Sequence, residues 1–371
     1  MSANKYILER SLLRPGDIIL TGDKGAVSLS VRAATISRYS HAALYVGGTT
    51  IEATLNGVFS KNPQRLIFDR PTDVLVLRAR RPLSEEEAFA ICDYAQSKVG
   101  SLYALNEAIT IRYRSLLRRQ DTNRQFCSRL VAKSYEYVGF DLMNLRDPAF
   151  CTPRQLALCK AFEPLRGLVR PASDAEVTFA VGDDPAQENL RCLYDWLNKV
   201  RALVNQDEQL AKEFDIQSSG DADKFLQVHP EYDDLLSGYL ESSGYLEFYT
   251  IEARNNPYRY RVDLFFGALS MAEDEEEFVG EELSKEVRIF RRFTIMQHYY
   301  AGLFKKTNLN FFRLQLRLYH NMVSEILIRT LVVRDALVLN GNTEAAESLD
   351  DTIQIVKLAV RDGQEALKSG T

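Results

Sequence analysis

The pattern of apolar residues changes near residue 171, and this change limits the possible folds more than any other feature of the 371-residue chain. Before it, short apolar and β-branched runs alternate with turns rich in Gly and Pro. After it, apolar residues recur at three- and four-residue spacing over long stretches. The first pattern is typical of short strands mixed with helices, and the second is typical of amphipathic helices. We therefore predict an α+β domain over residues 1–170 and an all-α domain over residues 171–371.

The same boundary divides the charge of the chain. Residues 1–170 carry 25 Lys and Arg against 16 Asp and Glu, whereas residues 171–371 carry 21 against 35, so the net charge of −5 hides two opposite halves. An acidic chain without a known nucleic-acid module argues against nucleic-acid binding. The basic half includes five arginines between residues 112 and 124. They either balance the acidic half or contact an anionic substrate or membrane surface, and both alternatives stay open.

The cysteines and histidines argue against metal sites and a disulfide framework. The five cysteines contain no CxxC pair and are odd in number, which favours a reducing compartment. No HExxH motif is present and the four histidines are widely spaced, so we expect neither a metal nor an organic cofactor. The first residues lack the apolar core of a signal peptide, and we expect no transmembrane segment. The prediction is a cytoplasmic protein or a bacterial toxin delivered without a signal peptide.

The first half contains five strand-like runs, at residues 17–20, 41–46, 50–53, 57–59 and 74–77. Tight turns connect several of them, so antiparallel pairing is the predicted arrangement. A helix is predicted to begin after Ser84, whose hydroxyl and Glu87 match a capping box. A second helix is predicted to follow Phe126. The sheet of the predicted α+β domain is expected to pack against this second helix.

Cys127 lies in the first turn of this second predicted helix, whose inward stripe we expect to include Leu130, Val131, Ser134 and Val138. The free N–H groups and the dipole of a helix N-terminus favour a thiolate, which is the nucleophilic form of cysteine, and the same N–H groups can hold an oxyanion. An inert buried thiol is the alternative, since free cysteine is often buried.

His41 and Glu52 supply the partners that a thiol nucleophile needs. His41 is the only histidine of the first half, and an imidazole can take and return the thiol proton. If Gly47 and Gly48 form a two-residue hairpin turn, Ala43 pairs with Glu52, and the carboxylate lies on the same sheet face as His41. There it can fix the imidazole tautomer. A three-residue turn would direct Glu52 away from His41 and make it a surface acid.

These residues together resemble the permuted papain-like branch of the NlpC/P60 superfamily, and within it the YiiX/YaeF-like cysteine hydrolases. The matching segments are Asp17–Leu20, Tyr39–Gly47, Ile51–Ala53 with Gly57–Val58, and Phe126–Val131, with weaker agreement at Gly100–Tyr103 and Thr152–Pro153. In ordinary NlpC/P60 enzymes the cysteine helix precedes the histidine strand. Here His41 precedes Cys127, which is the order of the permuted branch. The resemblance covers about residues 11–160.

The resemblance implies a papain-like fold and a set of roles. Cys127 would be the nucleophile, His41 the general base and then acid, Glu52 the residue that orients His41, and Tyr103 a residue lining the substrate pocket. Arg129 departs from the acidic or small residue common in relatives. The implied substrate is an amide bond in a small peptide or a cell-wall peptide.

Two other functions remain as alternatives at this point. Some permuted relatives, such as the lecithin:retinol acyltransferase-like proteins, act on acyl lipids, so the chain can be a phospholipase-like lipid esterase or an acyltransferase. Their cysteine lies in an Asn-Cys-Glu-His context that Phe126–Arg129 does not match. Alternatively the fold is a catalytically silent binding module. The sequence identifies no partner for the helical domain.

Overall fold

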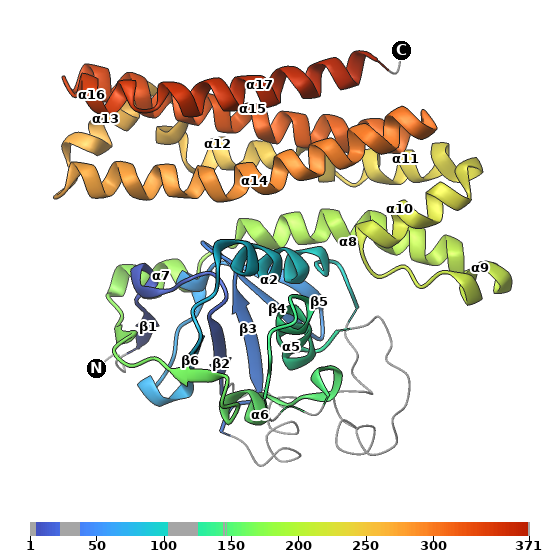
Figure 1. Ribbon diagram of the computed structural model, residues 1–371, viewed down its shortest axis with the longest axis horizontal. Coiled ribbons are helices and arrows are strands. Elements are labelled where there is room, and N and C mark those ends of the chain that lie inside the picture. Colours follow the sequence, from blue (N-terminus) through green and yellow to red (C-terminus); the bar gives the residue numbers. More distant parts are fainter. Residues whose placement is uncertain (1–4, 23–37, 103–124, 144, 146, 370–371) are drawn as a thin grey trace. The chain divides into compact units, whose positions relative to one another are not determined.

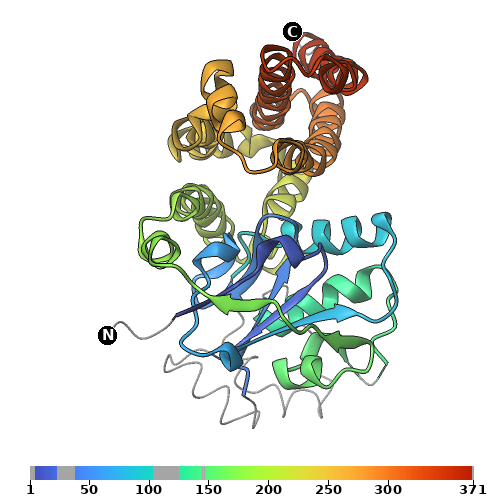
Figure 2. The ribbon, with the colours of Figure 1, turned by 90° about the vertical axis from the view of Figure 1, so that its left-hand side faces the viewer.

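The computed structural model describes residues 5–22, 38–102, 125–143, 145 and 147–369. These residues form two compact units (Figure 1, Figure 2). The first unit contains Met1–Leu190 and Arg201–Ala222, and the second contains Arg191–Val200 and Asp223–Thr371. The first unit is α+β and the second is helical, as the change in sequence pattern predicted. The domain boundary between residues 170 and 171 stays a prediction.

A six-stranded antiparallel sheet forms the centre of the first unit. Its strand order is β5-β4-β3-β2-β6-β7. The five strand-like runs of the sequence all appear in it, joined by one short strand from later in the chain. The bounds are β2 Ile18–Thr21, β3 His41–Tyr45, β4 Thr50–Thr54, β5 Gly57–Lys61, β6 Val74–Ala79 and β7 Phe162–Pro164.

The two faces of this sheet are both buried, which explains why its strands are apolar on successive residues. Ile18, Leu20 and Leu44 pack in one core with residues of helices α2 (Glu85–Ser97) and α5 (Cys127–Tyr137). Ile19 and Tyr45 belong to a second core together with residues from both ends of the first 170 residues. Adjacent strand residues thus face different cores, as the two-residue period of a strand requires.

The second core includes a small two-stranded sheet that the sequence pattern did not predict. Strand β1 (Tyr6–Leu8) pairs antiparallel with β8 (Val169–Pro171), so Ile7 lies opposite Arg170. The pairing joins segments more than 160 residues apart, and each is too short to be recognised from its own pattern.

The remaining short elements of the first unit are 3₁₀ turns and short helices. The 3₁₀ turns are η1 Arg10–Leu12, η2 Pro63–Arg65, η3 Pro71–Asp73 and η4 Pro148–Phe150, and the helices are α6 Pro153–Ala157, α7 Asp174–Val181, α9 Glu208–Glu213 and α10 Ser219–Val228, the last reaching into the second unit. Helix α8 (Pro185–Asn205) contributes residues to both units. The predicted capping box at Ser84 is present, with Glu87 as its partner.

The second unit consists of helices, of which α14, α15 and α17 are long and lie side by side (Figure 1). Its elements are η5 Pro230–Tyr232, α11 Asp233–Ser242, η6 Tyr245–Thr250, α12 Ile251–Asn255, η7 Pro257–Tyr260, α13 Val262–Ser270, α14 Glu275–Thr307, α15 Asn310–Leu339, α16 Thr343–Glu347 and α17 Asp350–Lys368. Asn308 adopts a left-handed conformation (φ 57°) between α14 and α15 and allows the tight reversal of the chain. Helix α15 begins where the Asp233 carboxylate accepts hydrogen bonds from its first two N–H groups.

The core of the second unit contains the single tryptophan of the chain. Trp196 is fully buried, and its ring centroid lies 5.9 Å from that of Phe311 and 6.1 Å from that of Tyr245. Its fluorescence therefore reports the packing of this unit.

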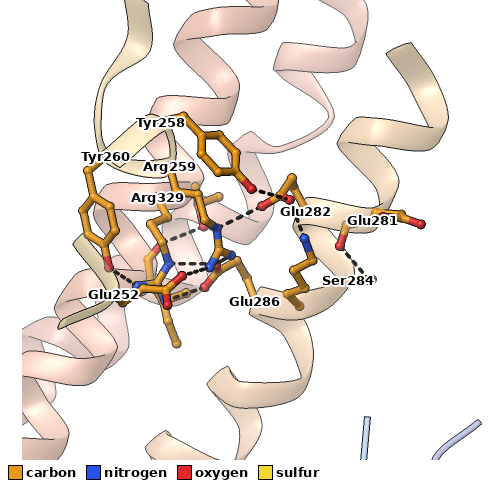
Figure 3. Close-up of polar contacts among 12 residues, drawn as sticks. Glu252, Tyr258, Arg259, Tyr260, Glu281, Glu282, Ser284, Glu286 and Arg329 are labelled. Atoms are coloured by element: carbon orange, nitrogen blue, oxygen red, sulfur yellow. Dashed lines mark hydrogen bonds and ion pairs between the residues drawn. The ribbon is translucent and has the colours of Figure 1, made fainter. Parts of the chain in front are cut away.

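A buried network of ion pairs connects η7, α12, α14 and α15 (Figure 3). Arg259 contacts Glu252, Glu282 and Glu286, and Arg329 donates two 2.8 Å hydrogen bonds to Glu286. Tyrosine hydroxyls and Lys285 complete it: Tyr258 donates to Glu282, and the Arg329 guanidinium donates to Tyr260. Each buried charge thus has an opposite charge beside it, which offsets the cost of removing it from water.

In the part of the chain that the structure describes, no helix combines the length and the apolar character needed to span a membrane.

Candidate active site

The three residues singled out in the sequence lie on three neighbouring elements of the first unit. His41 is the first residue of β3, Glu52 lies in the middle of β4, and Cys127 is the first residue of α5. Glu52 and Cys127 are buried, whereas the His41 side chain keeps 21% of its surface exposed. The site thus has a buried thiol and carboxylate and an imidazole that solvent can reach.

The hairpin between β3 and β4 has the register that places Glu52 beside His41. Gly47 and Gly48 both adopt positive φ (86° and 88°), the conformation that a two-residue turn of this kind needs. Val46 N–H donates to Thr49, and Ala43 lies opposite Glu52. The two-residue turn is therefore correct, and the three-residue alternative is wrong.

His41 makes two polar contacts. Its Nε2 lies 2.6 Å from the Glu52 carboxylate oxygen Oε2. The imidazole also hydrogen-bonds the Cys127 side chain. A ring that contacts both a carboxylate and a thiol is fixed in orientation.

The charges of these three groups depend on one another. Burial lowers the pKa of His41, but the hydrogen bonds to Cys127 and Glu52 outweigh it and raise the pKa to about 10. Burial raises the pKa of Cys127, yet the contact with His41 outweighs it, and the pKa is lowered. In the same way, His41 and Lys61 lower the pKa of Glu52 against the effect of burial. Near neutral pH the arrangement favours a thiolate–imidazolium pair beside an ionised carboxylate.

The N-terminus of α5 gives the thiolate further support. Phe126 precedes the helix in an extended conformation and provides no side-chain cap. The backbone N–H groups of Ala42 and Ser128 hydrogen-bond the Cys127 sulfur and help to lower its pKa. The first-turn N–H groups of a helix without a side-chain cap are suited to stabilising an oxyanion.

Burial of α5 extends further around the helix than the predicted inward stripe. Leu130, Val131 and Ser134 are buried as expected, but so are the neighbours of Cys127 in the first turn. Val138 follows the last residue of the helix and is only partly buried. The first turn is therefore enclosed on all sides, which restricts how far the cysteine backbone can move.

Two reciprocal hydrogen bonds attach this first turn to residue 151. The Ser128 hydroxyl donates to the Cys151 carbonyl (2.8 Å), and the Cys151 thiol donates to the Ser128 carbonyl (3.1 Å). Burial, the largest influence on this second thiol, raises the pKa of Cys151. Cys151 is therefore a packing residue with a neutral thiol, in contrast to the lowered pKa of Cys127.

Arg129 has a structural role in the same place. Its side chain is buried, and Nε donates a 2.8 Å hydrogen bond to the Ala149 carbonyl. The guanidinium lies over the Phe126 ring at 4.5 Å and the Phe150 ring at 5.4 Å. Arg129, which differs from the residue expected from the family resemblance, therefore links the start of α5 to η4.

Two of the sequence predictions fall on residues that the structure does not describe. Tyr103, predicted to line the substrate pocket, lies outside the described residues, as do the arginines between residues 112 and 124. Within the described ranges, no group of three or more His, Cys, Asp and Glu side chains is placed to hold a metal ion.

Sequence reasoning missed the backbone partners of the site. The Ala42 N–H group and the attachment of the α5 N-terminus to residues 149–151 depend on tertiary contacts and carry no sequence signal of their own. The burial of Arg129 had one indication, since it follows directly on a helix start flanked by apolar residues.

Comparison with known proteins gives one family and a remote structural likeness. The family model for the permuted papain-like amidase enzymes, YaeF/YiiX, C92 family, matches residues 12–147. The crystal structure of the metalloprotein yiiX from Escherichia coli O157:H7 is similar at 16% sequence identity and a TM-score of 0.27, covering 41% of this chain and 96% of that chain. No curated protein matches the sequence. Residues 12–147, which include His41, Glu52 and Cys127, are thus similar to the C92 family of permuted papain-like amidases.

Proposed function

We propose that the first unit is a cysteine amidase that hydrolyses an amide bond in a peptide or cell-wall peptide through an acyl-enzyme at Cys127. The observation that carries the proposal is the position of His41, which contacts the Glu52 carboxylate at 2.6 Å and also the Cys127 side chain at the start of α5. The family match supports the amide bond as the type of bond cleaved.

The first half of the reaction forms a thioester. The Cys127 thiolate attacks the carbonyl carbon of the amide, and the negative charge moves to the carbonyl oxygen, where first-turn N–H groups of α5 stabilise it. The His41 imidazolium gives its proton to the amide nitrogen. The C–N bond then breaks, the amine leaves, and the acyl group stays on the Cys127 sulfur.

The second half returns the enzyme to its starting state. Neutral His41 takes a proton from a water molecule that attacks the thioester carbonyl, and the C–S bond breaks to release a carboxylic acid and the thiolate. Glu52 keeps the ring in place and stabilises the imidazolium in both halves. The His41 side chain keeps 21% of its surface exposed, which leaves a route for water to the ring.

The test compares two substrate classes in parallel. The full chain is incubated with peptidoglycan fragments and, separately, with phospholipid vesicles, and products are identified by mass spectrometry. We expect new amine and carboxylic acid ends in the peptide fragments and no fatty acid from the vesicles. Cys127→Ala should abolish the products, whereas Cys192→Ala, at a partly exposed cysteine in the second unit, should leave them unchanged.

The other outcomes contradict the proposal in different ways. Fatty acid release from the vesicles alone would replace the amidase with a lipid esterase. A silent binding module would give no product from either substrate, and its Cys127 would react with iodoacetamide with the pH profile of an ordinary thiol, unchanged by His41→Ala.

A further inference from the structure

The segment Gly100–Leu102 connects the parts of the candidate site. Gly100 N–H donates to Val58, and Val58 N–H donates to Ser101, so the segment pairs with β5, the strand beside β4 and Glu52. At its other end the Leu102 carbonyl accepts from Gln125 N–H at 3.0 Å, two residues before Cys127. A shift of this short segment would therefore displace both the sheet edge and the start of α5.

Residues from the second half of the sequence hold this segment within the first unit. Arg201 on α8 is buried, and its Nη2 donates to the Gly100 carbonyl at 2.6 Å and to the Gln217 carbonyl at 2.8 Å, while Nε donates to the Ile216 carbonyl at 2.9 Å. The Gln217 side-chain oxygen accepts from Leu102 N–H at 3.0 Å.

All six backbone polar groups of Gly100–Leu102 thus have protein partners. Val58 satisfies two, Lys98 and Gln125 one each, and the remaining two depend on Arg201 and Gln217. Leaving a buried carbonyl or N–H group without its partner is unfavourable, and the segment can avoid this cost only by moving toward water.

We propose that Arg201 and Gln217 are positioning residues for Cys127, acting through Leu102 and Gln125, and that residues 201–217 therefore complete an active site whose family pattern ends at residue 147. The inference rests on the proposed function, since it concerns the same thiolate. Residues from the second half of the sequence would then affect the reactivity of Cys127 in the first half.

The test measures the alkylation rate of Cys127 by iodoacetamide against pH in the full-length protein. Arg201→Met removes three hydrogen bonds to carbonyls without changing the length of the side chain much. We expect the midpoint of the profile to rise by about one pH unit, which is about a tenfold lower rate below the midpoint. Gln217→Ala, which removes a single bond to the segment, should shift the midpoint in the same direction and by less.

Arg65 offers a matched control. It is an arginine of the first unit whose side chain is only 7% exposed, and its guanidinium donates to the carbonyls of Phe179, Gly182 and Asp183 at 2.6–3.0 Å and pairs with Asp184 at 3.5 Å. Arg65→Met removes a guanidinium that hydrogen-bonds the carbonyls of residues 179, 182 and 183 and not those of Gly100–Leu102, and it should leave the alkylation profile of Cys127 unchanged.

The outcomes separate this inference from the proposed function. A wild-type midpoint near the ordinary thiol value of about 8.5, unaffected by His41→Ala, would overturn the amidase itself. A low wild-type midpoint that Arg201→Met and Gln217→Ala leave unchanged would overturn only the positioning role. If Arg201→Met does not fold, the alkylation profile of Gln217→Ala alone tests the positioning role. An equal shift in Arg65→Met would show a general loss of stability and would also overturn the positioning role.

Discussion

Replacing Glu52 with glutamine tests the electrostatic basis of the site. The Nε2–Oε2 distance of 2.6 Å between His41 and a buried carboxylate describes a charge-assisted hydrogen bond, which contributes about 1.5–3 kcal/mol. One pKa unit corresponds to about 1.4 kcal/mol. Since the carboxylate favours the imidazolium, Glu52→Gln should lower the pKa of His41 by about one to two units from its value of about 10.

The sign of the effect defines what should be seen in solution. His41 is protonated below its pKa, so the pH range over which it can donate a proton to a leaving amine should lose about one to two units at its alkaline end. The pKa should stay above the ordinary imidazole value of about 6.5 because the contact with Cys127 remains.

The assay is an NMR titration of ring-labelled histidine. The chain has four histidines, so the His41 signal is identified by its absence from His41→Ala. Glu163→Gln serves as the control, because Glu163 pairs with Arg80 at the surface at 3.4 Å. A pKa of His41 in Glu52→Gln that equals the wild-type value would refute the assignment of Glu52 as the partner that holds the imidazolium.

Three further predictions concern the second unit, and each is read from Trp196 fluorescence in urea, because the only tryptophan lies in this unit. Glu286→Gln should lower the free energy of unfolding by about 3 kcal/mol, since it leaves the buried guanidinium of Arg329 without its carboxylate; a change below about 1 kcal/mol would contradict the importance of this ion pair. Gly363→Ala should also destabilise, by about 1 kcal/mol or more, because a Cβ there would lie 2.6–2.7 Å from side-chain atoms of α14 and α15. Gly302→Ala meets no atom within 4 Å on the exposed side of α14 and should stabilise by about 0.5–1 kcal/mol through helix propensity. Equal shifts for the two glycine variants would contradict the close packing at Gly363.

Much of the first unit could be predicted because its signals are local. Short apolar runs separated by turns mark five of the six strands of the main sheet. Gly47 and Gly48 marked a turn between β3 and β4, but only the structure showed that it is the two-residue turn. Strand β1 and its partner β8 escaped prediction, since three-residue strands gain their identity only by pairing across the chain.

The candidate site also has parts that the sequence predicted and parts that only the structure showed. Cys127 was predicted from its position at a helix start, and His41 and Glu52 were predicted to share a sheet face from the two-residue period of a strand. Nothing in a one-dimensional pattern reveals that the Ala42 N–H group reaches the Cys127 sulfur.

By itself the sequence determined the two kinds of architecture and the permuted order of histidine and cysteine, because these depend on periodicity and on local motifs. It left two hairpin registers open, and the structure selected the two-residue turn. Tertiary structure alone decided which distant groups satisfy buried backbone atoms. Arg201 and Gly100 are 101 residues apart, and no pattern links them, yet the hydrogen bond between them supports the segment that leads to Cys127. A buried carbonyl needs a donor, and only the folded chain determines which residue provides it.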